Sequence, residues 1–181
     1  MNKLLIIGIL FLATSCVTSK ITSNKSTDFN EKISKLYIVV KGTDSAESFF
    51  ESFTAELGNS LTQKGIESKV KYSDPLSLES ENDVNQYIND YNPNLIMIVN
   101  QTESRQTMNS GFNNGFGNTG WGYGSSNTGG TFDVKIFQPN SKNPIWRANL
   151  KADGQFGLKT STKKACEKLI EKLIEDELLQ L

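Results

Sequence analysis

Two continuous apolar stretches, residues 36–40 and 95–99, stand out in the chain. A strand that is apolar on both faces is typical of the centre of a sheet covered by helices. Between these stretches, apolar positions recur at helical spacing in residues 45–64 and again in residues 80–91. Residues 66–72 alternate between apolar and polar side chains instead. The pattern therefore predicts two central strands, two amphipathic helices and one half-exposed edge strand.

The second half of the chain predicts a hairpin and a final helix. Residues 131–137 and 146–152 alternate, and turn-forming residues 138–143 separate them. Residues 160–181 carry an apolar stripe at helical spacing. Residues 109–130 hold more than half of the 14 glycines and predict a long loop, because ordering glycine costs much backbone entropy. We expect an α/β (α+β) fold: a βαβαβββα chain with helices packed on a mixed five-stranded sheet in the order 2-1-3-4-5, and the Gly-rich loop between strands 3 and 4.

The amino-terminal segment is apolar and ends at a cysteine. Lys3 precedes an apolar stretch at residues 4–12, and the small residues 13–15 lead directly to Cys16. This layout is typical of a secretory signal peptide, and the stretch is shorter than the roughly 20 apolar residues that cross a bilayer. The segment resembles the signal of bacterial lipoproteins, with its lipobox cysteine. An ordinary signal peptide that happens to be followed by cysteine is the alternative.

The lipoprotein resemblance implies a membrane anchor. Residues 1–15 would be removed, and Cys16 would carry fatty-acyl chains such as palmitate, so that the lipid anchor is the contact with the membrane. Residues 16–33 are polar and predict a flexible tether, which leaves residues 34–181 as a single domain. Val17 stands where some lipoproteins carry an inner-membrane retention signal, so we expect the periplasmic face of the outer membrane.

Composition argues against several functions. The 19 Lys and Arg residues are balanced by 20 Asp and Glu residues, which disfavours a nucleic-acid partner. The chain has no histidine, so the commonest general base and metal ligand is missing. A G-x-G-x-x-G match at residues 115–120 precedes more glycine and a predicted strand, whereas a nucleotide site needs a helix there. We therefore expect no cofactor, no metal and no enzymatic activity.

Candidate contact residues lie in the Gly-rich loop and on the last strand. The loop carries Phe112, Phe116, Trp121 and Tyr123, and exposed aromatic side chains can dock on a membrane interface or a partner protein. Random drift of a low-complexity loop is the alternative. Strand alternation directs Arg147 away from the core, where it could contact an acidic partner.

A second resemblance covers most of the chain. Residues 130–132 (Gly-Thr-Phe) follow the Gly/aromatic loop, and residues 145–148 (Ile-Trp-Arg-Ala) precede a carboxy-terminal amphipathic helix. This order is similar to a family of bacterial lipoproteins known only as a domain of unknown function, in which leucine stands at the position of Phe132. The order of elements also resembles small domains of envelope lipoproteins that serve curli export or stimulate peptidoglycan polymerases, and the amino-terminal domain of the Tol-system propeller protein.

These observations together predict a membrane-anchored periplasmic lipoprotein. The expected role is a non-enzymatic binding or assembly accessory of an envelope complex, with an envelope protein as its partner. A small-ligand carrier, with a pocket between sheet and helix, is the alternative.

Overall fold

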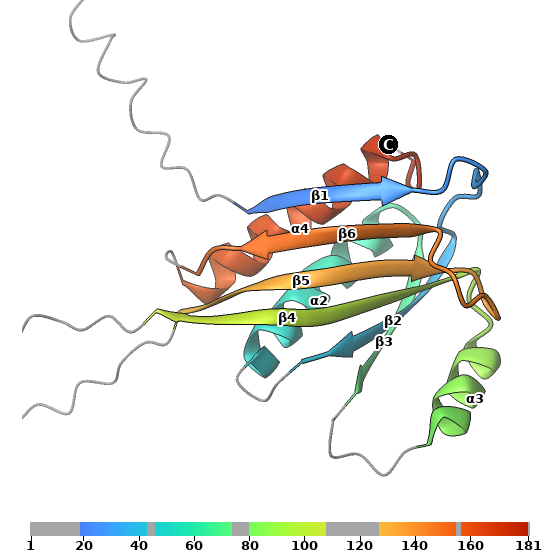
Figure 1. Ribbon diagram of the computed structural model, residues 1–181, viewed down its shortest axis with the longest axis horizontal. Coiled ribbons are helices and arrows are strands. Elements are labelled where there is room, and N and C mark those ends of the chain that lie inside the picture. Colours follow the sequence, from blue (N-terminus) through green and yellow to red (C-terminus); the bar gives the residue numbers. More distant parts are fainter. Residues whose placement is uncertain (1–18, 43–45, 74–79, 108–126, 155–156, 181) are drawn as a thin grey trace, which may run out of the picture.

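The structure is a computed structural model that describes residues 19–42, 46–73, 80–107, 127–154 and 157–180. Within these residues the chain forms one mixed six-stranded sheet with helices packed on it (Figure 1). The strands are β1 (Lys20–Lys25), β2 (Lys35–Lys41), β3 (Glu67–Ser73), β4 (Leu95–Thr107), β5 (Asn127–Phe137) and β6 (Trp146–Ala152). The helices are α2 (Glu47–Gln63), α3 (Glu81–Tyr91) and α4 (Leu158–Glu175). The prediction of an α+β fold with a mixed sheet is confirmed.

The sheet order is β1-β6-β5-β4-β2-β3. Strand β2 pairs in parallel with β3 and β4, while β4 with β5, β5 with β6, and β6 with β1 are antiparallel. The parallel half arises because α2 and α3 carry the chain back between β2, β3 and β4, as parallel pairing requires. Strand β3 lies at one edge, as its alternating sequence predicts.

The five-stranded sheet that we predicted is wrong, because β1 adds a sixth strand beside β6, while the other five strands keep the predicted order relative to one another. This strand lies in the segment predicted to be a flexible tether, so that prediction is also wrong for residues 20–25. Ile21 packs against the core, and the other side chains of β1 are polar. Backbone pairing with β6 therefore supplies most of what holds β1. The folded domain begins before residue 34.

Strands β4 and β5 extend farther than predicted, and residues 127–130 belong to β5 instead of the loop. Their register runs from Ile96 opposite Phe137 to Thr107 opposite Asn127, with a shift between Gln101 and Glu103. Glycine is required at this extension. A Cβ on Gly130 would lie 2.8 Å from the carbonyl oxygen of Glu103, so no larger residue fits. The remainder of the predicted loop lies outside the described residues.

The core lies between one face of the sheet and the helices α2 and α4, which pass behind the sheet in Figure 1. Its centre is an aromatic cluster in which the rings of Phe49 and Phe132 stack with centroids 4.7 Å apart. Phe50 meets Phe132 edge to face at 5.3 Å, and Phe53 stacks on Phe49. Burial of each such side chain contributes about 1.5–3 kcal/mol. This cluster joins α2 to the middle of the sheet.

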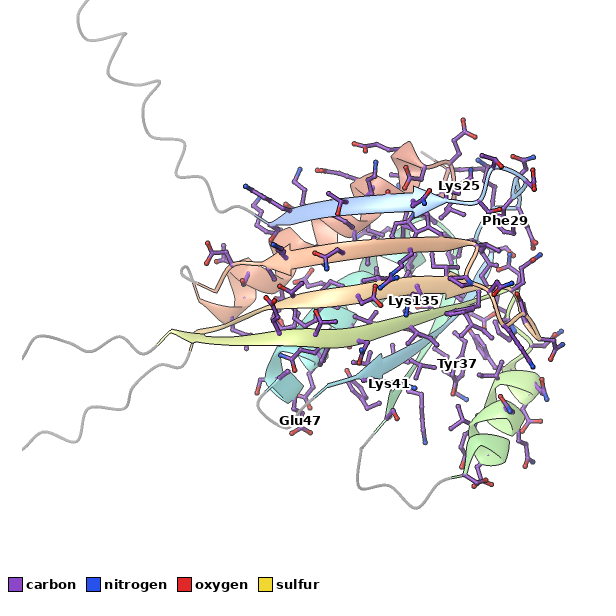
Figure 2. The ribbon with its side chains drawn as sticks, viewed as in Figure 1. Lys25, Phe29, Tyr37, Lys41, Glu47 and Lys135 are labelled. Carbon is purple, nitrogen blue, oxygen red and sulfur yellow. The ribbon has the colours of Figure 1, made fainter. Side chains whose placement is uncertain are left out.

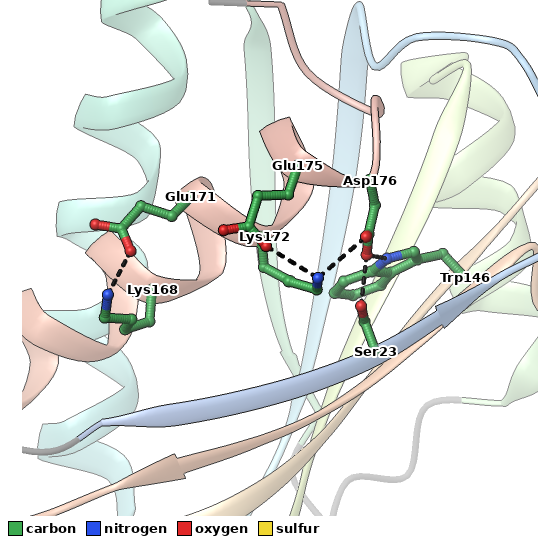
Figure 3. Close-up of polar contacts among 7 residues, drawn as sticks. All are labelled: Ser23, Trp146, Lys168, Glu171, Lys172, Glu175 and Asp176. Atoms are coloured by element: carbon green, nitrogen blue, oxygen red, sulfur yellow. Dashed lines mark hydrogen bonds and ion pairs between the residues drawn. The ribbon is translucent and has the colours of Figure 1, made fainter.

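The carboxyl group of Asp176, just after α4, fastens β1 and β6 to that helix (Figure 3). It accepts hydrogen bonds from the Ser23 hydroxyl and, at 2.7 Å, from the Nε1 of Trp146. Lys172 lies 3.2 Å from its other oxygen, and Lys25 donates to the backbone carbonyl of Asp176. Burial alone would raise the pKa of Asp176, but these hydrogen bonds hold it below its ordinary value.

Helix α3 lies on the opposite face of the sheet from α2 and α4. Ser80 caps its start in a capping box with Asp83, and Asn92 ends it in the left-handed conformation, with φ of 49°. The helix reaches the sheet through Tyr91, whose ring lies 5.7 Å from that of Tyr37. The sheet therefore has one fully covered face and one face that only α3 covers among the described elements.

Candidate binding face

The side chains of the strands that point away from α2 and α4 form the open face. The register assigns them, because paired residues point to the same side and alternate residues point to opposite sides. The basic side chains of this face, from β1 to β3, are Lys20, Lys151, Arg147, Lys135, Lys35, Lys41, Lys69 and Lys71. Among the described strand residues, its acidic side chains are Glu67, Glu103 and Asp133. Tyr37 and Lys41 on β2 and Lys135 on β5, three side chains of this face, are labelled in Figure 2.

This one-sided charge is hidden in the balanced totals of the sequence. We argued from those totals against a nucleic-acid partner, which needs a clustered basic face. Balanced totals do not exclude such a face, and the open face has an excess of basic side chains. Helix α2 carries acidic residues such as Glu47 and Glu51 and no basic residue, and α3, beside the open face, carries Asp83 and Asp90 and no basic residue. Helix α4 has five lysines against three glutamates, each of which pairs with a lysine three positions earlier. The open face therefore attracts anions although the chain is nearly neutral.

A groove of about 670 Å³ crosses the open face between α3 and the turn that joins β5 to β6. Its floor is apolar and comprises Val39, Ile96, Ile98 and Phe137. Ile96 and Ile98 are half-buried, although they lie in the central strand β4. The rim consists of the lysines 41, 71 and 142 together with serine, asparagine and glutamine side chains, and none of its described residues is acidic. Such a groove suits a ligand with an apolar part and a negative charge.

Lysines of β2 and β3 stack on the tyrosines of α3 and hold one wall of the groove. The Nζ of Lys35 lies 4.4 Å from the ring centroid of Tyr91, and the Nζ of Lys71 lies 4.8 Å from that of Tyr87. Cation–π contacts of this kind contribute about 0.5–1 kcal/mol at exposed sites. Desolvation, together with the charge of Glu67, raises the pKa of Tyr91 to about 12. The phenol therefore stays neutral beneath the lysines.

Beyond the groove, Asp133 forms a charge cluster with two basic residues of the open face. Its oxygens accept hydrogen bonds from Arg147 at 2.7 Å and 3.2 Å, and the Nζ of Lys135 lies at 3.0 Å. Burial alone would raise the pKa of Asp133, but these two partners hold it below its ordinary value. The side chain of Arg147 remains 62% exposed. The cluster keeps a net positive charge and a guanidinium that solvent can reach.

Of the residues predicted to make contacts, the described structure places Arg147. It lies on the open face, as strand alternation predicts, and Asp133 already pairs with it. The lipidation candidate Cys16 and the aromatic candidates Phe112, Phe116, Trp121 and Tyr123 lie outside the described residues.

The groove was not predicted from the sequence. The alternation of residues 66–72 predicted that Lys69 and Lys71 point to one side of the strand. This was the sequence pattern that could have indicated the basic rim of the groove. The sequence does not show which residues of different strands lie opposite each other. It therefore could not predict that Lys71 pairs with Val39, or that Ile98 pairs with Lys135.

The described residues offer little reactive chemistry. They contain no group of three or more His, Cys, Asp or Glu side chains placed to hold a metal ion. Cys166 lies buried between α4 and α2, and desolvation raises the pKa of its thiol to about 11, which keeps it protonated and a poor nucleophile. No helix in the described part of the chain is long and apolar enough to cross a bilayer.

The architecture defines a class: small α+β domains with a mixed sheet, two helices on one face and an open second face. Among solved structures, the chain is similar to a PelC dodecamer from Paraburkholderia phytofirmans, with 12% identity and a TM-score of 0.52 over 84% of this chain and 95% of that one. A single-residue variant of the same PelC dodecamer gives 11% identity and a TM-score of 0.54 over 84% and 96%. These likenesses show a shared fold. No protein-family model matches the chain, and no curated protein matches it.

Proposed function

We propose that the protein is a lipid-anchored lipoprotein at the periplasmic face of the outer membrane, where it serves as a non-enzymatic binding or assembly accessory of an envelope complex. The observation that carries this proposal is the open face, which combines an excess of basic side chains with an apolar groove. A sheet face with half-buried isoleucines gains free energy when a partner removes them from water.

The shared fold supports an assembly role. PelC from Paraburkholderia phytofirmans, which has the same fold, forms a dodecamer. The fold is therefore compatible with extensive contacts between protein chains. We expect the open face of this chain to serve such contacts, because α2 and α4 cover the other face.

The position of β1 supports the anchor. Lys20 begins β1 four residues after Cys16, so the backbone atom that carries the acylated side chain would lie within about 14 Å of the start of β1. Lys20 and Thr131 both pair with Lys151, so the start of β1 and the start of β5 lie at the same end of the sheet. The segment with Phe112, Phe116, Trp121 and Tyr123 leaves β4 and enters β5 at this end. We propose that these aromatic residues contact the membrane interface or a membrane-bound partner.

The anchor is tested by mass spectrometry of the amino terminus and by cell fractionation. We expect a chain that begins at an acylated Cys16 and sediments with outer membranes, and we expect Cys16→Ala to lose both the acyl mass and the outer-membrane location. An unmodified amino terminus would refute the anchor and favour an ordinary signal peptide.

The binding role is tested by photocrosslinking in cells. A photoreactive amino acid at Asn85, which lines the groove, should capture a defined set of envelope proteins, while the same group at exposed Glu171 on α4 should not. Deletion of residues 110–124 with a short replacement turn should weaken this capture if the loop contacts the same partners. Identical products from Asn85 and Glu171 would contradict a specific role for the open face.

A small-ligand carrier is the second candidate, and the groove itself favours it. Its volume of about 670 Å³ lies within the range of about 300–1,000 Å³ that is typical of ligand pockets. Native mass spectrometry of the protein purified from its host tests this candidate. A co-purifying small molecule that Ile98→Ser releases would support it.

A further inference from the structure

One line of residues crosses the sheet beneath the groove and continues beyond it. Lys71 of β3 pairs with Val39 of β2, Val39 pairs with Ile98 of β4, Ile98 pairs with Lys135 of β5, and Lys135 pairs with Arg147 of β6. We call this line the cross-strand row. It places a cation at one end, two apolar side chains in the middle and two cations at the other end.

The spacing of the row is fixed by the sheet. Neighbouring strands lie about 4.7–4.9 Å apart, so Lys71 and Lys135, which are three strands apart, are separated by about 14–15 Å. In an extended peptide, side chains at positions i, i+2 and i+4 point to one side, and the first and last are about 13–14 Å apart. The distance between side chains i and i+4 of an extended peptide therefore matches the distance between Lys71 and Lys135 across the sheet.

The charge and polarity of the row define what fits it. Val39 and Ile98 lie in the apolar floor of the groove, and Lys71 lies on its rim. Lys135 and Arg147 share Asp133, which leaves one net positive charge at that end of the row. Val39 is already 5% exposed, so the gain from covering the middle of the row comes from half-buried Ile98, which favours an apolar group, whereas the ends of the row favour negative groups.

We propose that the groove binds an extended acidic segment of another protein, in which an apolar side chain at position i+2 stands between acidic side chains at i and i+4. The apolar side chain contacts Val39 and Ile98, and the two carboxylates lie against Lys71 and against the pair Lys135 and Arg147. This inference deepens the proposed binding role and rests on it.

Two other occupants fit the row less well. A small amphiphile has one charged end and would leave the net positive charge of Lys135, Arg147 and Asp133 without a further anionic partner, because Lys135 and Arg147 lie outside the groove. A nucleic-acid strand carries a phosphate at every nucleotide, so it would place charge over the apolar middle and close to Asp133. The alternation of charged, apolar and charged groups is a feature of a peptide.

The test measures fluorescence anisotropy of a labelled peptide with the core sequence Glu-Ser-Leu-Ser-Glu, added to the full-length protein in detergent. We expect saturable binding, which weakens at least tenfold when both glutamates become glutamine or when leucine becomes serine. A peptide of the same composition with adjacent glutamates should also bind at least tenfold more weakly, because it cannot reach both ends of the row.

The protein variants compare equal losses of charge on the two faces. Lys71→Gln combined with Lys135→Gln should weaken binding of the peptide at least tenfold. Lys159→Gln combined with Lys163→Gln, two exposed positions on α4, should change it less than twofold. Ile98→Ser tests the apolar contact separately, and thermal unfolding of each variant confirms that it is folded.

The result that overturns the proposal is equal loss of peptide binding in the two double lysine variants, or equal binding of the glutamate and glutamine peptides. Full displacement of the peptide by decanoate would assign the groove to a small amphiphile instead. Tighter binding of a single-stranded oligonucleotide than of the peptide, with the same dependence on Lys71 and Lys135, would assign it to a polyanion. Crosslinking at Asn85 can still succeed in each of these cases, so failure of the peptide is distinguishable from failure of the proposed binding role.

Discussion

Removal of the Asp176 carboxyl group should loosen β1 without unfolding the rest of the domain. In Asp176→Ala, the indole N–H of Trp146 loses its acceptor, and Trp146 is 1% exposed. An unsatisfied buried donor costs about 1–3 kcal/mol. Ser23 and Lys172 are less buried and can form hydrogen bonds with water instead, so the loss of each of their contacts destabilises the protein less than the loss of the Trp146 contact. We expect a loss of about 2–4 kcal/mol in the free energy of unfolding.

Two measurements test this prediction. Urea denaturation gives the free energy of unfolding, and hydrogen exchange gives the protection of each strand. We expect faster exchange of the β1 amides than of the β2 and β4 amides in Asp176→Ala, because Asp176 fastens β1 to α4. Glu175→Ala is the control, because its side chain is 63% exposed, and it should cost less than about 0.5 kcal/mol.

The pH dependence gives a further check. The folded-state pKa of Asp176 is lowered from 3.8, so its contribution is fully present above that pH and is lost as the pH falls toward the folded-state value. The difference in stability between wild type and Asp176→Ala should therefore shrink as the pH falls below about 4. A difference that stays constant down to pH 2, or unchanged protection of β1 at pH 7, would refute the role of this carboxylate.

Three other substitutions or reactions probe the core. Phe132→Ala should cost about 3–5 kcal/mol by denaturant unfolding, whereas Phe132→Leu should cost about 1 kcal/mol, and equal losses would contradict the stacking on Phe49. Gly130→Ala should lower the thermal unfolding midpoint by several degrees, since its Cβ would lie 2.8 Å from a backbone oxygen; an unchanged midpoint would show that β4 and β5 can separate there. Cys166, with a pKa raised to about 11, should react with a disulfide reagent at pH 8 only as fast as the protein unfolds when tested in a Cys16→Ala background. Rapid labelling of the folded chain would show that the thiol is accessible.

The central part of the fold could be read from the sequence, because continuous apolar runs and helical spacing both report burial. Strand β1 could not. Its sequence, KITSNK, offers Ile21 as its single apolar position, and its burial pattern alternates between exposed and half-buried. An edge strand needs little apolar surface when the backbone of β6 and the carboxyl group of Asp176 hold it. These contacts join segments more than a hundred residues apart, and no local pattern reports them.

The sequence also did not predict that β5 extends through Gly129 and Gly130, and the reason is different. Glycine is unfavourable in strands and predicts a loop, but here it permits a close approach of the backbone. A Cβ on Gly129 would lie 2.7 Å from the carbonyl oxygen of Ala152. Glycine is therefore ambiguous in a sequence: its local preference predicts a turn, whereas in the folded protein it can mark a place where two strands come close together.

The candidate site was visible only in parts. Arg147 was assigned to the outer face from alternation, and Lys135 has the same parity on β5. The sequence does not give the strand register that places these two residues in line with Lys71 and the apolar Val39 and Ile98. The balanced charge totals conceal the excess of basic side chains on one face.

The lysines of the open face have two explanations, and their positions separate them. Lys69 and Lys71 lie on the edge strand β3, where lysine discourages pairing with another chain. Lys135 and Arg147 lie on β5 and β6, which are paired on both sides, so protection of an edge does not account for them. The two directly opposed cations repel each other, and Asp133, which pairs with both, offsets this repulsion. The three side chains together carry one net positive charge in the interior of the sheet, and this is the charge that the proposed acidic segment would meet beyond the groove.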